Sequence, residues 1–304
     1  MSPLPVLALT LGDPRGIGPE IVRAALASSG VAGAARFVVV GPAGVGLAVE
    51  ESVGTWDGST GASAADAAGR ERDARAGRLA GLAIERAVEL AKEGRVQGIV
   101  TGPIDKAALH AGGYDYPGHT EMLEALTGTP TAMMLVSPRL RVVLATTHLP
   151  LRDVPRALTR EAILRAARLT REGLQRWFDV GSPRIALCAL NPHGGEQGRF
   201  GDEEERLLTP AAREAGIAGP FSADTIFVRA MRGEFDAVIA PYHDVGMTAI
   251  KVASFGEAVN VTLGLSFVRT SPDHGTALNI AGQGVARTES MVAAMLLAAR
   301  LAAR

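Results

Sequence analysis

The sequence has one cysteine, few aromatic residues and almost no net charge. Cys188 lies in the apolar run RIALCAL, so no disulfide can form within the chain and no thiolate cluster can bind a metal. Any metal ion must therefore be held by His, Asp or Glu. Aromatic residues make up only 4% of the chain, which argues against the stacking surfaces that bind single-stranded nucleic acid.

Neither sign of charge dominates. The 31 basic and 32 acidic residues leave a formal net charge of −1, so no overall field attracts the chain to nucleic acid or an anionic membrane surface. Long apolar runs are also lacking, because MVAAMLLAARLAAR is interrupted by Arg300 and falls short of the ~20 residues that span a bilayer. The first residues, MSPLPVLALTLGD, lack the basic flank of a signal peptide. We expect a soluble, cytoplasmic protein that binds a small metabolite, with neither nucleic acid nor membrane as a partner.

The chain does contain a regular alternation of strand-like and helical patterns. At 304 residues it is long enough for one large domain or two medium ones, because single cores stop growing at roughly 250–300 residues. The alternation predicts an α/β protein with largely parallel sheets, and a hairpin around Ser137 makes one sheet mixed. Residues 52–77 are small and polar and predict a flexible connection, followed by an amphipathic helix over 78–93.

The stretch 242–284 holds two clusters of polar residues that core packing alone does not require. The first, PYHDVGMTAIK, places His243 and Asp244 where the strand-like run DAVIAP ends, and ligands in open α/β sheets collect at the carboxyl ends of strands. The second, SPDHGTALNIAGQG, reads as a glycine-rich loop that offers polar side chains and backbone amides to a ligand. Between the clusters lie Lys251, Asn260 and Arg269, two cations and an amide that suit an anionic substrate.

Two further histidines also follow strand-like runs. His148 closes RVVLATTH and His193 follows RIALCAL, so these two and His243 can reach one cleft although they lie far apart in sequence. Three neutral imidazoles suit Zn²⁺ or a neighbouring divalent ion and leave positions open for substrate oxygens. The alternative is three separate histidines that hydrogen-bond to loop ends, and spacing alone does not decide between the two.

The first glycine-rich turn, GDPRGIGPE, is not a dinucleotide-binding fingerprint of the Rossmann type. Gly16 and Gly18 match its first two glycines, but position 21 is Ile, so the third is missing.

As a set, the motifs resemble the 4-hydroxythreonine-4-phosphate dehydrogenase family of pyridoxal-phosphate synthesis over nearly the whole chain. The resembling segments are GDPRGIGPE, TGPIDK, GHTE, TTHLPLRD, NPHGGE, ADT, YHDVG, NVTLGL, RTSPDHGTA and IAGQG. This resemblance implies two α/β/α subdomains with a cleft between them, as in isocitrate and isopropylmalate dehydrogenases, which bind the dinucleotide without a Rossmann fingerprint. It implies a cofactor-side subdomain of residues 1–112 plus 264–304, and a metal, substrate and dimerisation subdomain of residues 113–263.

The resemblance also implies roles for individual residues. The metal ligands would be His148, His193 and His243, at a site shared by the two subunits of a homodimer. The substrate contacts would be His119, Thr120, Lys251, Asn260 and Arg269. The cofactor, NAD or NADP, would lie against Asp273, His274, Gly275, Asn279 and Gly282. The candidates for the general base are Lys251, Asp244 and Asp224, each of which has a structural ion pair as its alternative.

The implied reaction is oxidation of 4-phosphohydroxy-L-threonine with loss of CO₂, which gives 3-amino-2-oxopropyl phosphate. It needs NAD(P)⁺ and one divalent ion, Zn²⁺, Mg²⁺, Co²⁺ or Mn²⁺. The alternative substrates are 4-phospho-D-threonate, the corresponding erythronate and an aromatic cis-dihydrodiol dicarboxylate; a metal-dependent lyase or hydrolase is a remoter alternative.

Two positions depart from the family pattern. Asn279 replaces a usual acid that accepts from the cofactor's ribose, and Gln283 replaces a frequent lysine. The neutral amide of Asn279 predicts a relaxed preference for NAD⁺ over NADP⁺.

Overall fold

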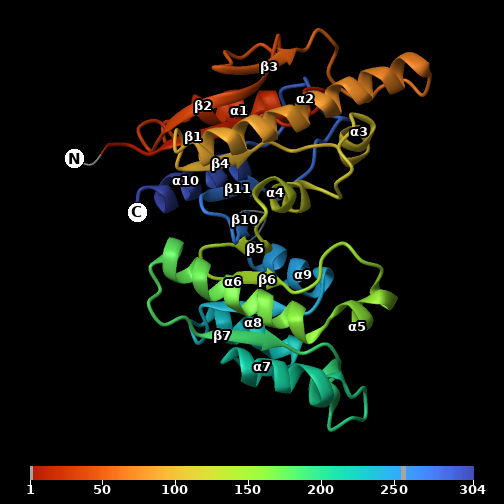
Figure 1. Cartoon of the computed structure of the whole chain (residues 1–304), viewed down its shortest axis with the longest axis vertical. Coiled ribbons are helices and arrows are strands. Elements are labelled where there is room, and N and C mark those ends of the chain that lie inside the picture. Colours follow the sequence, from red (N-terminus) through yellow and green to blue (C-terminus); the bar gives the residue numbers. More distant parts are fainter. Residues whose placement is uncertain (1–2, 255–257) are drawn as a thin grey trace. The chain divides into compact units, whose positions relative to one another are not determined.

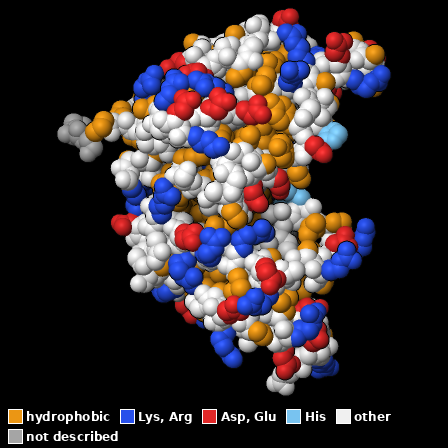
Figure 2. Space-filling view, viewed as in Figure 1, with side chains coloured by type: hydrophobic (Ala, Val, Ile, Leu, Met, Phe, Trp, Pro, Cys, Tyr) orange, Lys and Arg blue, Asp and Glu red, His pale blue; other side chains and the backbone are white. Residues whose placement is uncertain are grey.

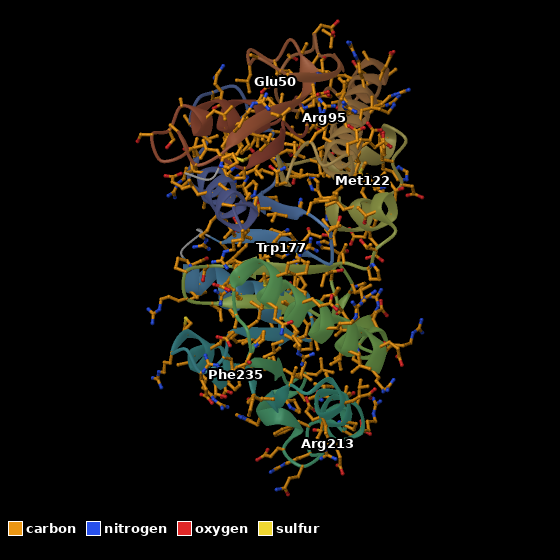
Figure 3. The ribbon with its side chains drawn as sticks, turned by 60° about the vertical axis from the view of Figure 1, so that its left-hand side comes forward. Glu50, Arg95, Met122, Trp177, Arg213 and Phe235 are labelled. Carbon is orange, nitrogen blue, oxygen red and sulfur yellow. The ribbon has the colours of Figure 1, made fainter. Side chains whose placement is uncertain are left out.

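The computed structural model describes residues 3–254 and 258–304 and divides the chain into two compact units. Unit 1 comprises Met1–Pro130 and Leu265–Arg304, and unit 2 comprises Thr131–Gly264. The boundary predicted from the sequence placed residues 113–130 with the middle of the chain, whereas they belong to unit 1. The reason is the helix α4 (His119–Thr127), which buries Met122 and Leu123 completely in the core of unit 1 against the long helix α2 (Figure 3).

Unit 1 is built on a wholly parallel sheet. Its strands, in order across the sheet, are β3 (Glu51–Thr55), β2 (Arg36–Ala43), β1 (Val6–Thr10), β4 (Gly98–Thr101) and β11 (Val268–Pro272). Its helices are α1 (Gly18–Leu26), α2 (Ala67–Lys92), α3 (Lys106–Ala111), α4 and α10 (Glu289–Ala302) (Figure 1). The central strands are continuous apolar runs and are almost fully buried, as expected of parallel strands that are covered on both faces.

The segment predicted as a flexible connection is largely ordered. It contains β3 and the first turns of α2, which begins at Ala67, well before the predicted residue 78. Asp66 caps the helix by accepting a 2.7 Å hydrogen bond from the amide of Gly69. The early turns escaped the prediction because their charged residues carry no apolar stripe; they are held instead by Asp73, which pairs with the buried Arg15.

Unit 2 has a mixed sheet, as the predicted hairpin required. Its strands, in order, are β10 (Val259–Leu263), β5 (Ala132–Val136), β6 (Arg141–Leu144), β9 (Ala237–Ala240), β7 (Ile185–Cys188) and β8 (Ala218–Phe221). Its helices are η1 (Leu151–Asp153), α5 (Val154–Ala157), α6 (Arg160–Phe178), η2 (Pro192–Gly195), η3 (Glu204–Leu208), α7 (Thr209–Ala215), α8 (Ala223–Met231) and α9 (His243–Ser254). The hairpin β5–β6 is antiparallel, and β6, β9, β7 and β8 run parallel to one another.

The two sheets confirm the α/β class predicted from the alternation of patterns. Acidic and basic side chains alternate over the face shown in Figure 2, in keeping with the near-zero net charge. Among the helices of the described residues, none combines the length and apolar character that crossing a bilayer requires.

Candidate active site

Three adjacent parallel strands of unit 2 lead to the three histidines that the sequence singled out. The strands β6, β9 and β7 are neighbours in the sheet, and each is followed closely by His148, His243 or His193. Carboxyl ends of parallel strands meet at one edge of a sheet, where α/β proteins bind ligands. The rings of His148 and His243 lie there with their centroids 5.6 Å apart, a spacing at which two imidazoles can bind one divalent ion.

His243 is held in an orientation that suits a metal ligand. It is the first residue of α9, and its Nδ1 lies 2.6 Å from Oδ1 of Asp244. A carboxylate on one ring nitrogen fixes the tautomer and leaves Nε2 to bind a metal. Asp244 can therefore orient the ring of His243. This role is an alternative to the role of general base, for which Asp244 is also a candidate.

His193 lies on a loop with unusual backbone geometry. Its φ of 52° is left-handed, and its ring contacts that of Phe200 with the centroids 6.4 Å apart. Over residues 3–254 and 258–304, no group of three or more His, Cys, Asp or Glu side chains is arranged so that it could hold a metal ion. The structure thus brings His148 and His243 together but does not gather His193 with them.

The other candidates of unit 2 are spread over three elements. Lys251 is exposed on α9, two turns after His243, and Asp224 is exposed in the first turn of α8, which packs against η2 and so against the loop of His193. Asn260 is half-buried on β10, and its Oδ1 is buried without a hydrogen-bond partner in the described structure. Asn260 is thus ready to accept from a ligand.

Unit 1 contains a buried arginine, Arg269, with further basic side chains near it. Arg269, on β11, is only 1% exposed, and its Nη2 donates a 2.6 Å hydrogen bond to Oγ1 of Thr101 at the end of β4. Burial lowers the pKa of Arg269 to about 9, because a cation removed from water is costly unless an anion compensates it. The site is therefore suited to an anionic ligand.

His119 begins α4 and lies near Arg269. Burial holds its pKa well below the usual value, and the positive charges of Arg269 and Lys106 lower it further. Its Nε2 is buried and has no hydrogen-bond partner among the residues described. Thr120 is half-buried in the first turn of α4, whose N-cap residue, Gly118, provides no side-chain hydrogen bond.

Sequence reasoning did not assign a role to Lys106 or Thr101. Both lie in or beside the segment TGPIDK, which was noted only as part of a resemblance. The signal that finds them is their contact with Arg269 and His119, which depends on the fold.

The low pKa of His119 leads to a testable pH dependence. The folded protein favours the neutral imidazole, whereas the unfolded chain protonates near the ordinary value of 6.5. Stability is therefore lost as pH falls through the unfolded value, since the unfolded state then binds more protons. We expect His119→Gln to flatten the fall in melting temperature between about pH 8 and pH 5, while the exposed His110→Gln keeps the wild-type slope. Parallel curves for wild type and His119→Gln would contradict this assignment.

The predicted cofactor residues lie on the loop that follows β11. The sequence predicted that this loop begins at Ser271. In the structure Ser271 and Pro272 still belong to β11, so the loop begins after Pro272. Of the five residues, Asp273 accepts a 3.4 Å hydrogen bond from Ser290, and His274 has a buried Nε2 for which the described part of the chain supplies no partner. Gly275, Asn279 and Gly282 are exposed.

This loop is tied to the turn GDPRGIGPE. The amide of Ile17 donates a 2.9 Å hydrogen bond to the carbonyl of Thr276. A Cβ on Gly16 would come within 2.8 Å of the same carbonyl oxygen, so the glycine is required for close backbone approach rather than for a Rossmann turn.

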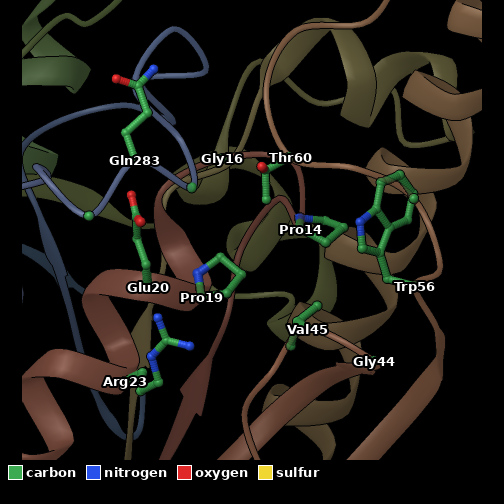
Figure 4. Close-up of a pocket in the computed structure, with 13 residues that line it drawn as sticks. Pro14, Gly16, Pro19, Glu20, Arg23, Gly44, Val45, Trp56, Thr60 and Gln283 are labelled. Atoms are coloured by element: carbon green, nitrogen blue, oxygen red, sulfur yellow. The ribbon is translucent and has the colours of Figure 1, made fainter.

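A cavity of about 420 Å³ in unit 1 lies beside the same turn and loop, within the size range of small-molecule sites. Glu20 and Arg23 of α1 line one side, Trp56 the other, and Gln283 reaches over them (Figure 4). Of the five predicted cofactor residues, only Gly282 lines it.

The fold is that of a β-decarboxylating dehydrogenase. The enzyme of that type from Thermococcus kodakarensis covers 96% of this chain and 82% of its own, with a TM-score of 0.52 and 17% identity. That likeness concerns the fold alone. The chain belongs to the PdxA family, because the family model described as "Pyridoxal phosphate biosynthetic protein PdxA" matches residues 50–298.

Relatives with assigned names agree with that membership. The 4-hydroxythreonine-4-phosphate dehydrogenase of Geobacter metallireducens is 44% identical over 98% of this chain and 96% of its own. The D-threonate 4-phosphate dehydrogenase of Cupriavidus necator is 43% identical over 99% of this chain and 98% of its own. The predicted family is confirmed, and the chain belongs to a family of oxidoreductases.

Solved structures give the same result. The 4-hydroxythreonine-4-phosphate dehydrogenase of Klebsiella pneumoniae has a TM-score of 0.83 at 38% identity, with 98% of this chain and 99% of that chain covered. The terephthalate 1,2-cis-dihydrodiol dehydrogenase of Burkholderia xenovorans is more distant, with a TM-score of 0.63 and 26% identity over 95% of each chain.

Proposed function

We propose that the protein catalyses the NAD(P)-linked oxidative decarboxylation of 4-phosphohydroxy-L-threonine to 3-amino-2-oxopropyl phosphate and CO₂. The observation that carries the proposal is the convergence of three adjacent parallel strands on His148, His193 and His243, in a chain of the PdxA family. The buried guanidinium of Arg269 in unit 1 supports an anionic substrate.

Three imidazoles of unit 2 are our proposed ligands of one divalent metal ion, although only His148 and His243 lie beside each other in the described structure. His148, His193 and His243 would hold it, since His243 keeps Nε2 available and lies 5.6 Å from His148, centroid to centroid. When bound, the ion supplies Lewis acidity, which favours ionisation of a substrate hydroxyl and stabilises the enolate that decarboxylation forms. Zn²⁺, Mg²⁺, Co²⁺ and Mn²⁺ are all compatible with imidazole and substrate oxygens.

The loop after β11 would hold the nicotinamide cofactor. Asp273, His274, Gly275, Asn279 and Gly282 are our proposed contacts, supported by the unpartnered Nε2 of His274 and by the neighbouring cavity that Gly282 lines. The hydrogen bond from Ile17 to Thr276 keeps this loop against the first glycine-rich turn.

The chain's own residues bind and orient the substrate. Arg269, His119 and Thr120 are proposed to take its anionic groups, together with Lys251. Asn260 offers a buried acceptor, Oδ1, to a donor such as the substrate ammonium or hydroxyl. The hydride leaves the carbon that bears the hydroxyl, the hydroxyl proton passes to a base, and the resulting β-keto acid loses CO₂.

The general base is chosen from three candidates. Asp244 is engaged with His243, which favours an orienting role for it. Lys251 lies on the same helix as His243, and Asp224 lies on α8, which packs against η2. Lys251 and Asp224 therefore remain the proposed bases.

We also propose that the enzyme is a homodimer whose subunits share the active site. Large apolar side chains of unit 2 that remain exposed lie near the three histidines in sequence or in space. They include Leu149, Leu151, Phe200 and Val252. Exposed apolar surface of this kind is typical of an interface, and sedimentation equilibrium is expected to give twice the chain mass.

D-threonate 4-phosphate is the second candidate substrate, because a relative with that name is 43% identical. The two substrates carry the same phosphate and differ in the group at C2, amino against hydroxyl. Comparing kcat/KM for both, with NADH or NADPH formation as the readout, decides between them. A higher value for D-threonate 4-phosphate would overturn the first assignment, and a low value with both but turnover of an aromatic cis-dihydrodiol would favour that substrate class.

Asn279→Asp is expected to restore a preference for NAD⁺. A carboxylate accepts from the ribose 2′-hydroxyl and repels the 2′-phosphate of NADP⁺. The ratio of kcat/KM for NAD⁺ to that for NADP⁺ should rise about tenfold, equivalent to ~1.4 kcal/mol. Asn279→Ala, which adds no charge, is the control, and an equal shift in both variants would show that the carboxylate is not responsible.

A further inference from the structure

We propose that Glu204 is a positioning residue that fixes the backbone of the His193 loop and thereby the direction from which this histidine can bind a metal ion. The inference rests on the proposed function, since it assigns a role to Glu204 only if His193 is a metal ligand. It concerns a side chain that lies eleven residues after His193.

The carboxylate of Glu204 is buried and binds the start of the loop at three points. The side chain is 6% exposed and opens the π-helical turn η3. Its Oε1 accepts hydrogen bonds from the amides of Leu190 (2.9 Å) and Asn191 (2.8 Å), and its Oε2 accepts one from Nδ2 of Asn191 (2.9 Å). These contacts fix the backbone two and three residues before His193.

The same carboxylate also packs against the other side of His193. A Cβ on Gly195 would come within 2.8 Å of Oε2 of Glu204, so the loop folds directly onto the carboxylate. Glu204 thus contacts the chain on both sides of the histidine.

The loop needs such support because its backbone is unfavourable. His193, Glu196 and Gln197 all have positive φ, at 52°, 42° and 58°. L-residues in this region carry a conformational cost, and they persist only where surrounding contacts over-determine them.

Within the described residues, no Lys, Arg or His side chain forms an ion pair with Glu204. Among the ion pairs of residues 3–254 and 258–304, none involves Glu204, so its charge is compensated by N–H donors of the loop alone. A buried carboxylate that depends on loop amides couples its own burial to the loop conformation.

The test is Glu204→Gln. The amide keeps the size and one acceptor oxygen, but its NH₂ group is a donor and cannot accept the hydrogen bond that Oε2 of Glu204 accepts from Nδ2 of Asn191. We expect Co²⁺ affinity to fall about 10–100-fold, the range for residues that orient metal ligands, with a changed absorption spectrum of bound Co²⁺. Turnover of 4-phosphohydroxy-L-threonine by Glu204→Gln should recover partly at saturating Co²⁺. Recovery would show that the substitution weakens metal binding more than it lowers kcat.

Glu203→Gln is the matched control. Glu203 is adjacent, accepts one hydrogen bond from Nδ2 of Asn191 (2.7 Å) and lies 3.7 Å from Arg206, but within the described residues its carboxylate accepts no hydrogen bond from the loop backbone. Its Co²⁺ affinity and spectrum should stay within about twofold of wild type. If Glu204→Gln does not fold, as judged by circular dichroism without metal, Asn191→Ala removes one of the three contacts and should weaken Co²⁺ binding several-fold.

The outcomes separate the two proposals. If His193→Ala weakens Co²⁺ binding but Glu204→Gln and Asn191→Ala bind as wild type, the metal site stands and the role of Glu204 is overturned. If His193→Ala itself binds Co²⁺ as wild type, the proposed ligand set fails and the role of Glu204 fails with it.

Discussion

His243→Ala is expected to abolish tight binding of the divalent ion and to lower kcat/KM by about 10³-fold or more, at ~1.4 kcal/mol of barrier per factor of ten. The residue supplies one ring at 5.6 Å from His148, and its other ring nitrogen is held by Asp244. Removing it leaves too few imidazoles to polarise the substrate oxygen.

The matched control is His110→Ala. His110 is exposed on α3 of unit 1 and lies 3.4 Å from Asp115. Metal content is measured by mass spectrometry of the desalted protein, and rates by NADH formation. Normal metal content and a kcat/KM within tenfold of wild type for His243→Ala would remove it from the ligand set.

Arg269→Met is expected to lower kcat/KM without lowering the melting temperature. Arg269 is buried with a pKa lowered by desolvation, so in the free protein its charge costs stability that a bound anion offsets. Replacing a buried charge by an apolar side chain of similar size is often neutral or stabilising. We expect a melting temperature equal to or above that of wild type, with kcat/KM lowered by about 10²-fold or more through lost charge-assisted contacts.

Arg287→Met controls for loss of a positive charge. Arg287 is 86% exposed and pairs at 3.6 Å with Glu289, so both stability and kcat/KM should be close to wild type. A destabilised Arg269→Met with normal kcat/KM would show that the arginine serves the fold instead of the substrate.

Addition of phosphate to the wild-type protein extends this prediction. The anion should raise the melting temperature of wild type more than that of Arg269→Met, because only wild type retains the buried positive charge that an anion can bind.

The positions of the strand ends could be predicted, because they depend on the pattern of apolar and polar residues within a short segment of the sequence. Apolar runs that end in histidine identify strand ends, and the structure places β6, β9 and β7 side by side and parallel. The hairpin around Ser137 was predictable for the same reason, since two short β-rich runs flank a turn.

What depends on tertiary contact was not predictable. The early turns of α2 lack an apolar stripe and are held by an Asp66 cap and by Asp73, so their charged sequence read as a connection. Residues 113–130 join unit 1 through the burial of Met122 and Leu123, a contact between segments far apart in the chain.

The candidate site shows the same division. Residue types and strand ends made His148, His193, His243 and Arg269 candidates, and the family resemblance added His119. The proximity of Thr101 to Arg269, and the effect of Lys106 on His119, required the fold. The left-handed conformation of His193 depends on Glu204, which no spacing rule connects to it.

The central claim is a metal-dependent dehydrogenase whose ion is held by histidines of unit 2. The most direct test follows NADH or NADPH formation from 4-phosphohydroxy-L-threonine with chelator-stripped enzyme, before and after addition of Zn²⁺, Mg²⁺, Co²⁺ or Mn²⁺. We predict no turnover without metal and restored turnover, with release of CO₂, when one of these ions is returned. Equal turnover by the stripped and the restored enzyme would contradict the account.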